Sequence, residues 1–431
     1  MNYCGIIAKI AKTEQIEKAD NIQVAYVLGE PVIVSKTAKE GDLGVYFPAE
    51  TQLSHDYVSD NGLYRNSENN KNPKAKGFFE DNRRVRAQPF LGVKSCGYFA
   101  GLESFHFTGY DISKLELGMM FEELNGVPIA QKYINPRTKK AQANQRTKAR
   151  KKQETPLFHQ HVDTDQFKYH VDRIPAGSII SIQAKGHGTS ARYSHTLVEK
   201  ELPWWKRLVN KVVPIFETQE WDYVAGTRRV VLKNSQKDKE GFHGNEGFRF
   251  EILEQLKPFL NRGVTVYGEI VGFANGKPIM GTHDVTKLKD KQFTKKYGKE
   301  ITYTYNCLPD EYKFYAYRVT ITSIDGTEID LTQSQFKRWC EDRGIESTLD
   351  LVEPFVYRGD SDSLMNVVDV LTEREDNLCE DYRDPSHISE GVVIRVDGET
   401  LVPKFYKNKS IPFKILEGIY RENNVDMEDS S

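Results

Sequence analysis

The chain contains the stretch Gln183-Ala184-Lys185-Gly186-His187-Gly188-Thr189-Ser190-Ala191-Arg192, which follows an apolar run at residues 177–182 that predicts a strand. A lysine at the end of a strand, followed by glycines and hydroxyls, is a candidate covalent nucleophile. Lysine attacks phosphorus only as the free amine, and we expect burial among other cations to lower the pKa of Lys185. The glycines would let the backbone approach a nucleotide closely. A lysine-glycine turn alone is more typical of an ordinary loop, so the function depends on the rest of the chain.

Length and composition predict two or three globular domains in a reducing compartment. The chain has 431 residues, of which 38% are hydrophobic and 28% charged. No apolar run approaches the ~18 residues of a membrane span, and no signal peptide is evident, so we expect no membrane partner. Five cysteines are widely separated and form no Cys-x-x-Cys pair. This argues against a zinc or disulfide framework and favours the cytoplasm, or the host cytoplasm if the protein is viral.

A basic segment separates two regions of different character. Nine basic and no acidic residues lie between positions 131 and 152, namely Lys132, Arg137, Lys139, Lys140, Arg146, Lys148, Arg150, Lys151 and Lys152. Such a run is typical of a solvated, flexible segment, and it could also contact phosphates. We therefore expect a basic linker at residues 129–158.

The two flanking regions differ in their expected secondary structure. Residues 1–128 contain several short apolar runs with glycine-bearing turns, which favour a small closed β-barrel of the OB type. Residues 159–431 mix helical and strand patterns, which predicts an α+β domain. We expect helices at residues 202–215 and 248–260, and strands at residues 264–272, 313–321, 391–396 and 401–406.

Five segments downstream of Lys185 carry the groups that such a lysine needs. They are Gly226-Thr227-Arg228-Arg229-Val230, the strand around Glu269, the aromatic strand with Tyr315 and Tyr317, the segment beginning Ser389-Glu390-Gly391, and the strand with Lys407 and Lys409. Each alone is more often structural than functional. Together they supply carboxylates for a divalent metal, an aromatic ring to stack on a base, and cations for a triphosphate. That combination indicates covalent nucleotidyl transfer.

The set resembles the covalent nucleotidyltransferases, which include ATP-dependent ligases and capping enzymes. Lys185-Gly186-His187-Gly188-Thr189-Ser190 is similar to the first motif of the RNA ligase 2 family, written Lys-x-His-Gly-Thr-Asn/Ser. DNA ligases and capping enzymes usually carry Asp at the position of His187. Residues 267–272, 390–395 and 407–410 are similar to the third, fourth and fifth motifs of that family. The resemblance covers about residues 162–414.

The resemblance implies a fold, a reaction and a set of roles. The fold is a nucleotidyltransferase (ATP-grasp-like ligase) domain at residues 159–431, preceded by an OB-like nucleic-acid-binding domain, as in one branch of RNA ligases. The reaction is ATP-dependent joining of RNA ends through lysyl-AMP and AMP-RNA, in nick sealing or RNA repair, by a monomer acting on RNA or an RNA-containing duplex. The implied catalytic residue is Lys185; the nucleotide-binding residues are His187, Gly188, Arg228, Glu269, Tyr317, Lys407 and Lys409; and the ligands of Mg²⁺ or Mn²⁺ are Glu390 and Glu269.

Several alternatives stay open at this point. Arg228 or Arg229 could face the nucleotide, because an insert with Trp204 and Trp205 lengthens the interval before them, and Tyr315 could replace Tyr317. Arg318 stands where the family usually has Asp. A DNA ligase or a guanylyltransferase remains possible, although His187 and the short chain after residue 410 argue against both. A non-catalytic OB-fold protein is disfavoured by the intact lysine and carboxylates.

Overall fold

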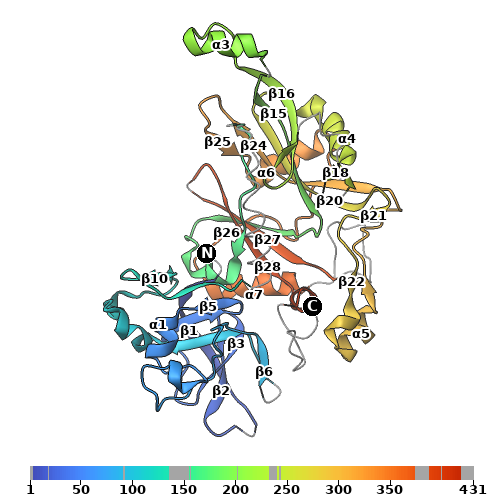
Figure 1. The fold of residues 1–431 in the computed structure, drawn as a ribbon. Coiled ribbons are helices and arrows are strands. Elements are labelled where there is room, and N and C mark those ends of the chain that lie inside the picture. Colours follow the sequence, from blue (N-terminus) through green and yellow to red (C-terminus); the bar gives the residue numbers. More distant parts are fainter. Residues whose placement is uncertain are drawn as a thin grey trace.

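The computed structural model describes residues 3–17, 19–90, 93–134, 155, 157–200, 202–232, 240–241, 244–373, 388–398 and 400–418. Most of the basic segment expected at residues 129–158 lies outside these ranges. The described chain is a mixed α+β structure, as expected, with a barrel near the N-terminus and a larger part that carries Lys185 (Figure 1). In the described ranges, every helix is too short or too polar to cross a membrane.

The N-terminal region is a nearly closed, barrel-like sheet. Its strands are β1 (Gly5–Gln15), β2 (Ile22–Val27), β3 (Glu30–Ser35), β4 (Leu43–Pro48), β5 (Thr51–Leu53), β6 (Gln88–Phe90), β7 (Val93–Ser95), β8 (Gly97–Gly101), β9 (Met120–Phe121), β10 (Glu123–Leu124), β11 (Val127–Pro128) and β12 (Ala130–Lys132). Its helices are α1 (His55–Asp60) and the 3₁₀ turns η1 (Ser67–Asn69), η2 (Leu102–Thr108) and η3 (Ile112–Lys114).

The main sheet of this region runs β3–β2–β1–β4–β8, with β9 beside β1. Its two ends nearly meet, because the Cys96 amide donates to the Pro31 carbonyl at 2.7 Å and the Ile33 amide donates to Ser95 Oγ at 3.2 Å. In β3 every second residue is buried, which is the period expected of a strand with one face on a core. The region is therefore barrel-like, as expected, but the main sheet is nearly closed and not fully closed.

The C-terminal part is built on two sheets. Its strands are β13 (Asp165–Gln166), β14 (Ile179–Ala184), β15 (Thr189–Glu199), β16 (Gln219–Gly226), β17 (Val231–Leu232), β18 (Glu240–Gly241), β19 (Gly244–Asn245), β20 (Val264–Ala274), β21 (Lys277–Pro278), β22 (His283–Asp284), β23 (Glu300–Ile301), β24 (Tyr312–Thr322), β25 (Glu328–Asp330), β26 (Phe355–Val356), β27 (Gly391–Asp397) and β28 (Lys404–Lys409). Its helices and 3₁₀ turns are η4 (Phe167–Tyr169), η5 (Val171–Arg173), α3 (Trp204–Val212), α4 (Gly247–Leu256), η7 (Lys257–Phe259), η8 (Val285–Leu288), α5 (Lys291–Tyr297), α6 (Gln333–Glu341), α7 (Ser361–Thr372) and α8 (Ile411–Leu416).

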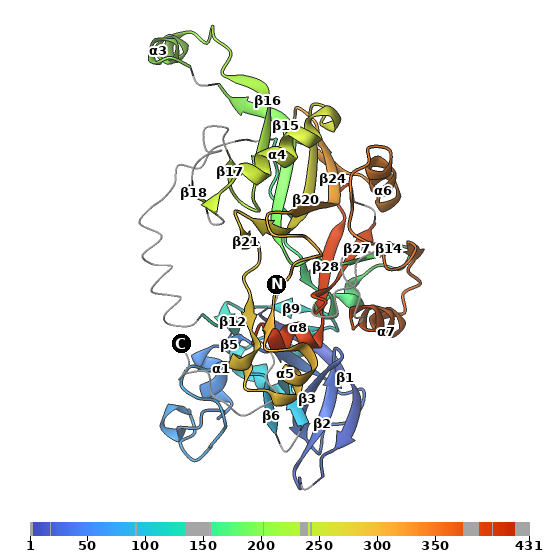
Figure 2. The same cartoon turned by 90° about the vertical axis from the view of Figure 1, so that its right-hand side faces the viewer.

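The connection between these two sheets is the Lys185 loop. The larger sheet runs β17–β16–β15–β20–β24–β25, and the smaller runs β13–β28–β27–β14–β26. Strand β14 ends at Ala184 in the smaller sheet, and β15 begins at Thr189 in the larger one. The two sheets and this junction can be followed in Figure 2. Lys185 to Gly188 therefore lie where groups from both sheets can converge.

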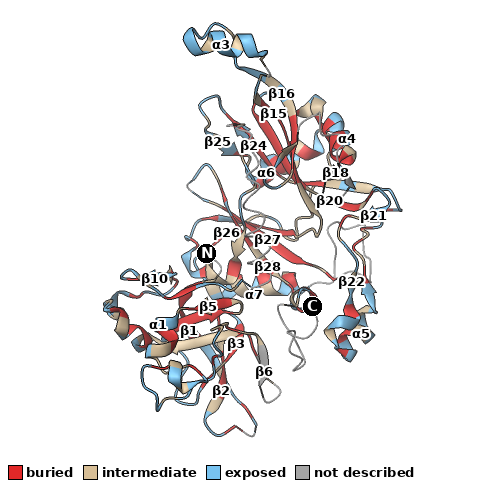
Figure 3. Ribbon diagram, viewed as in Figure 1, coloured by how far each residue is buried: buried red, intermediate tan, exposed pale blue. Residues whose placement is uncertain are grey.

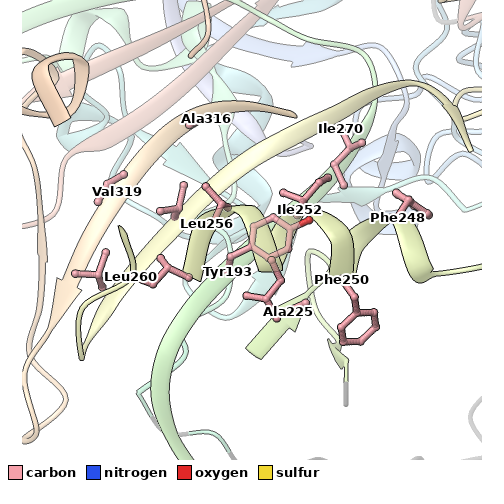
Figure 4. Packing of buried hydrophobic residues seen from close by; sticks show 14 of the residues in the cluster. Tyr193, Ala225, Phe248, Phe250, Ile252, Leu256, Leu260, Ile270, Ala316 and Val319 are labelled. Atoms are coloured by element: carbon pink, nitrogen blue, oxygen red, sulfur yellow. The ribbon is translucent and has the colours of Figure 1, made fainter. Parts of the chain in front are cut away.

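Apolar packing holds each sheet in place. Helix α4 covers the larger sheet, where Tyr193, Ile252 and Leu256 are buried in one cluster (Figure 4). Each such side chain contributes about 1.5–3 kcal/mol by leaving water. Helix α7 packs on the smaller sheet through Leu364 and Val368. Strands β20 of the larger sheet and β27 of the smaller one are mostly buried (Figure 3). The lysine loop is thus mounted on two rigid layers.

Three expected elements differ from the structure by three or more residues at one end at least, including the helix expected at residues 202–215, which spans Trp204–Val212. The helix expected at residues 248–260 ends at Leu256 and continues as the 3₁₀ turn η7, which contains Pro258. The strand expected at residues 401–406 starts later, at Lys404, and continues to Lys409. The helix expected at residues 202–215 is α3, none of whose residues is buried.

Candidate active site

Short contacts fix the Lys185 loop at both ends. The Lys185 amide donates to the Gly391 carbonyl at 2.9 Å, and the His187 amide donates to the Tyr305 hydroxyl at 2.8 Å. Gly188 lies so close to β20 that an added Cβ would come within 2.3 Å of the Ile270 carbonyl oxygen. A side chain at position 188 would therefore push the loop away from the strand that carries Glu269.

The buried carboxylate of Glu390 contacts Lys185 and His187 of the loop, and also Lys409 of β28. Nζ of Lys185 lies 3.0 Å from Oε1 of Glu390, whose side chain is only 6% exposed. Nδ1 of His187 donates to Oε2 of Glu390 at 3.2 Å, and Nζ of Lys409 lies 3.6 Å from Oε1. Burial favours the neutral acid, but Lys185, His187 and Lys409 outweigh it and lower the pKa of Glu390 to about 2. Glu390 is therefore ionised and held from three directions.

The pKa of Lys185 is raised, contrary to the expectation from the sequence. Burial alone would lower it, but the carboxylates of Glu390 and Glu269 together outweigh burial. The sequence analysis considered basic residues around Lys185, whereas the fold also places the carboxylates of Glu390 and Glu269 beside its amine. The amine therefore stays protonated until the charge of Glu390 is compensated.

Glu269 lies on β20, directly opposite Ser190 of β15. Its Oε2 accepts a hydrogen bond from Ser190 Oγ at 3.2 Å. Burial raises the pKa of Glu269 to about 7, although the Lys185 charge acts in the opposite direction. The two carboxylates near Lys185 therefore differ: Glu390 is a fixed anion, and Glu269 gains or loses its proton near neutrality.

A pocket of about 140 Å³ opens beside Lys185. Its walls include Lys185, Arg228, Glu269 and Tyr317. Arg228 also pairs with Asp163. Gly186 of the lysine loop is part of the same wall. The pocket thus joins the expected nucleophile, one expected carboxylate and an aromatic side chain.

A β-bulge decides which tyrosine faces this pocket. The pairing of β20 with β24 steps from Arg318 to Ala316 while β20 advances by one residue, so Tyr317 is left without a pairing partner. In a regular strand, period-two alternation would put Tyr315 and Tyr317 on one face, and the bulge interrupts this alternation. Tyr315 is 3% exposed and lies in a separate apolar cluster. Tyr317 instead lines the pocket, and its hydroxyl is hydrogen-bonded to His161 Nδ1 at 2.5 Å.

Arg318 forms a buried ion-pair cluster at the edge of the pocket. Its guanidinium contacts both carboxylate oxygens of Asp330 at 2.7 Å and Oε2 of Glu328 at 3.2 Å. It also lies 4.7 Å from the centre of the Tyr267 ring. Arg318, which stands where the related family usually has Asp, is therefore paired with Asp330 and Glu328.

Lys407 and Lys409 lie on one face of β28, as expected from their spacing. They line a second cavity of about 110 Å³ between the barrel and the smaller sheet, together with Lys168 and Lys414. Burial, Lys409 and Lys185 lower the pKa of Lys407. Both lysines thus stand near the Lys185–Glu390 pair, and they line a different cavity from the pocket of Tyr317.

Comparison with known proteins assigns the family. Residues 179–416 match the family model described as RNA ligase. The chain belongs to the RNA ligase family. A comparison with curated proteins finds no match.

Solved RNA ligases share the fold along nearly the whole chain. The RNA ligase of Naegleria gruberi solved with pyrophosphate has a TM-score of 0.54 and 16% identity, and the alignment covers 96% of this chain and 98% of that one. Two lysine mutants of the same protein, one with ATP and Mn and one with AMP and Mn, each have a TM-score of 0.52, 16% identity and the same coverage. The N-terminal barrel lies outside the family match but inside these structural alignments.

Glu269 and Glu390 fit a divalent cation that arrives with a nucleotide. In the part of this RNA ligase that the structure describes, no group of three or more His, Cys, Asp or Glu side chains could hold a metal ion. Mg²⁺ is commonly bound by one or two carboxylates, with phosphates and water completing its shell. The two carboxylates beside Lys185 are a donor set of that kind.

Sequence reasoning missed two residues that support the ligase site. Arg249 is 1% exposed; its guanidinium donates to the Ser190 carbonyl at 3.1 Å and to Thr189 Oγ1 at 2.9 Å. An arginine inside the apolar run of α4 was the available signal. His161 contacts Tyr317, and burial followed by several arginines lowers its pKa to about 3. Its place soon after the basic segment gave no such indication.

Proposed function

We propose that this protein is an ATP-dependent RNA ligase that joins a 3′-hydroxyl to a 5′-phosphate through lysyl-AMP and AMP-RNA, in nick sealing or RNA repair. The observation that carries the proposal is the Lys185–Glu390 pair, 3.0 Å apart, beside a pocket that also holds Glu269 and Tyr317. The family assignment supports RNA joining. The relatives solved with ATP, AMP or pyrophosphate support ATP as the nucleotide.

In the first step, Nζ of Lys185 attacks the α-phosphorus of ATP. The ammonium first gives one proton to solvent. A nitrogen–phosphorus bond then forms, the bond from the α-phosphorus to the bridging oxygen breaks, pyrophosphate leaves, and the nitrogen releases a second proton to solvent and keeps the third. Lys407, Lys409 and Arg228 are placed to neutralise phosphate charge around Lys185. Positioning and charge neutralisation supply most of the catalysis in this type of transfer.

The pocket beside Lys185 would hold the nucleoside. Tyr317 offers its ring to adenine, and Glu269 is placed for the ribose or for a metal-bound water. Gly188 keeps the loop close to β20, so the nucleotide and Glu269 can approach the same amine. Mg²⁺ or Mn²⁺ held by Glu390 and Glu269 would compensate the charge that keeps Lys185 protonated and would polarise the α-phosphate.

In the later steps the RNA ends react. The RNA 5′-phosphate takes AMP from Lys185, which breaks the nitrogen–phosphorus bond, and the 3′-hydroxyl then displaces AMP to form the phosphodiester. By holding Glu390, His187 acts on these steps as well as on the first one. The partly open N-terminal barrel is of the kind that binds oligonucleotides in OB folds, so we assign it to RNA binding. We infer that the enzyme acts as a monomer in the cytoplasm.

Nucleotide labelling tests the first step. Incubation with α-labelled ATP and Mg²⁺ is expected to leave acid-labile label on the wild type and on Lys287→Ala, a control at a lysine whose side chain is 81% exposed. Lys185→Ala is expected to remain unlabelled. Label on Lys185→Ala would refute the assignment of the nucleophile. Labelling by GTP in place of ATP would favour a guanylyltransferase.

Nick sealing tests the substrate. We expect a nick with RNA on the 3′-hydroxyl side to be sealed faster than an all-DNA nick, because ribose 2′-hydroxyls let a protein distinguish RNA from DNA. Equal sealing of both nicks would contradict RNA preference without affecting the labelling result.

A further inference from the structure

The hairpin of β15 and β16 ends in an exposed amphipathic tip, which we define as residues 203–216. The two strands pair as far as Glu199 and Gln219, and α3 lies across their end. In both views the tip stands away from the rest of the molecule, at the opposite end from the N-terminal barrel (Figures 1 and 2). The active-site residues described above lie in the body below it. The tip therefore has no evident part in the ligation chemistry.

The apolar side chains of the tip face solvent on one side of α3. At 100° per residue, the apolar residues of α3 fall within an arc of about 140°, and the polar ones fill the rest. The exposed fractions are 76% for Trp204, 57% for Leu208 and 82% for Val212. Ile215, just after the helix, is 66% exposed. A contiguous apolar surface of this kind marks an interaction site.

The tip is ordered without burying this apolar face. The side chain of Asn210 donates to the Phe216 carbonyl at 2.7 Å and accepts from the Phe216 amide at 2.9 Å, which closes the segment after the helix. The Trp205 and Phe216 rings pack edge to face at 5.7 Å. The apolar face is therefore presented by a preformed structure.

The charge of the tip identifies its partner. Residues 203–216 contain Lys206, Arg207 and Lys211 and no acidic residue. In the sequence the tip is flanked by Glu199, Glu201, Glu217 and Glu220, of which Glu217 and Glu220 pair with Lys200 on the stalk below. Tryptophan and aliphatic side chains on one face, with lysine and arginine on the other, are typical of helices that lie in a membrane interface. Anionic headgroups would complement the basic residues.

We propose that this tip docks the ligase reversibly on an anionic lipid surface. The short α3 cannot span a bilayer, so the attachment is peripheral. It departs from the expectation from the sequence that the chain has no membrane partner. The ring of Trp204 could stack on a base, but Leu208, Val212 and Ile215, which share the exposed face, are aliphatic and offer no such surface, so RNA is less suited to the tip. The orientation of α3 across the end of the hairpin would let its apolar face meet a flat surface while the body stays in water.

Vesicle flotation of the full chain tests the proposal. The wild type is expected to float with phosphatidylcholine vesicles that contain phosphatidylserine, and to be released by high salt. Leu208→Glu/Val212→Glu should weaken this binding by at least about tenfold, because each change removes an apolar contact and adds a repelled charge. The matched control is Leu308→Glu/Ile324→Glu, at positions 65% and 77% exposed elsewhere on the surface, which should bind as the wild type does. Lysine labelling by ATP, measured without vesicles, should be unchanged in both variants.

Four outcomes would overturn the proposal. Absence of wild-type binding to the mixed vesicles would refute it, and so would equal flotation of the tip variant. A wild-type dimer in solution that Leu208→Glu/Val212→Glu converts to a monomer, without lipid binding, would assign the tip to a second copy of the chain. Weaker binding of nicked RNA by the tip variant, without lipid binding, would assign it to the substrate. None of these outcomes depends on whether the enzyme seals RNA.

Discussion

Nζ of Lys185 lies 3.0 Å from Oε1 of Glu390, so the proposed nucleophile forms an ion pair with a buried carboxylate. The pair has opposite consequences for its two members. Burial alone would raise the pKa of Glu390, but Lys185 and the other nearby basic groups lower it to about 2. Burial alone would lower the pKa of Lys185, but the carboxylates of Glu390 and Glu269 raise it. An amine in this state cannot attack ATP, so the arrangement keeps Lys185 unreactive until the nucleotide site is filled.

Replacing Glu390 by Gln should make Lys185 reactive at lower pH. The amide keeps the shape of the side chain but removes the charge that favours the protonated amine. We expect acylation of Lys185 by an amine-specific reagent, followed by mass spectrometry in the absence of ATP, to begin at lower pH than in the wild type. Glu254→Gln, at an exposed carboxylate paired with Lys257, is the control and should leave the profile unchanged. An unchanged profile in Glu390→Gln would show that the pair does not control the amine.

His187→Ala should slow lysine adenylylation by about tenfold, equivalent to about 1.4 kcal/mol, because Oε2 of Glu390 loses its hydrogen bond at 3.2 Å. His187→Asn should recover most of the rate, since its amide nitrogen can replace Nδ1. If His187 acts through Glu390, adenylylation and nick sealing fall in parallel when each is measured in single turnover. A loss confined to sealing would instead place His187 in contact with RNA.

The order of the motifs predicted which residues meet around Lys185, because their positions on strands are visible as apolar periodicity and turn glycines. Glu269 and Tyr317 lie on strands close to the expected bounds, whereas Lys407 lies beyond residue 406, the expected end of its strand. Period-two alternation did not predict which of Tyr315 and Tyr317 faces the pocket, because a bulge interrupts it. The bulge depends on how β24 pairs with β20, and the local sequence carries no information about that pairing.

The electrostatics of the site were the least predictable part. The sign of the Lys185 pKa shift depends on Glu390, which lies 205 residues further along the chain. The partners of Arg318 could not be foreseen for a related reason: Asp330 and Glu328 lie on β25, which becomes adjacent only through its pairing with β24. The burial of Arg249 could not be predicted from the sequence. An arginine in an apolar helix can be buried only if other groups accept its hydrogen bonds, and here Ser190, 59 residues earlier in the chain, does so.

Arg318→Met should destabilise the catalytic domain by about 3–5 kcal/mol, because Asp330 is left as an unpaired charge with a side chain 1% exposed. The double variant Arg318→Met/Asp330→Leu should recover much of this loss, since it removes both charges together. Thermal unfolding of the two variants and the wild type measures the difference. A normal melting temperature in Arg318→Met, together with weaker ATP binding, would place Arg318 in the nucleotide site instead.

Glu30→Gln should impair RNA sealing more than adenylylation. Glu30 belongs to the barrel, and its Oε1 lies 3.0 Å from Nζ of Lys414 and 4.0 Å from Nζ of Lys168, both in the catalytic part. Loss of the charge should loosen the barrel against α8, which follows Lys409 directly, and slow nick sealing by roughly tenfold for a change of about 1.4 kcal/mol. Glu68→Gln, at an exposed position of the barrel, is the control. Equal loss of adenylylation and sealing would mean that the contact supports the catalytic domain itself.

Glu269→Gln should become more stable than the wild type as pH rises from about 4.5 to about 7. Burial raises the pKa of Glu269 from its ordinary value of 4.5 to about 7, so in this range the unfolded chain releases a proton that the folded chain retains. The unfolded state then binds fewer protons, and the wild type loses stability with increasing pH, whereas the glutamine variant has no proton to lose there. We expect the difference in melting temperature between the variant and the wild type to grow across this window and to stay constant above it. Thermal scans of the nucleotide-free proteins in a pH series measure it. A difference that does not change with pH would mean that Glu269 ionises as freely in the folded enzyme as in water, and that its burial beside Lys185 carries no electrostatic cost.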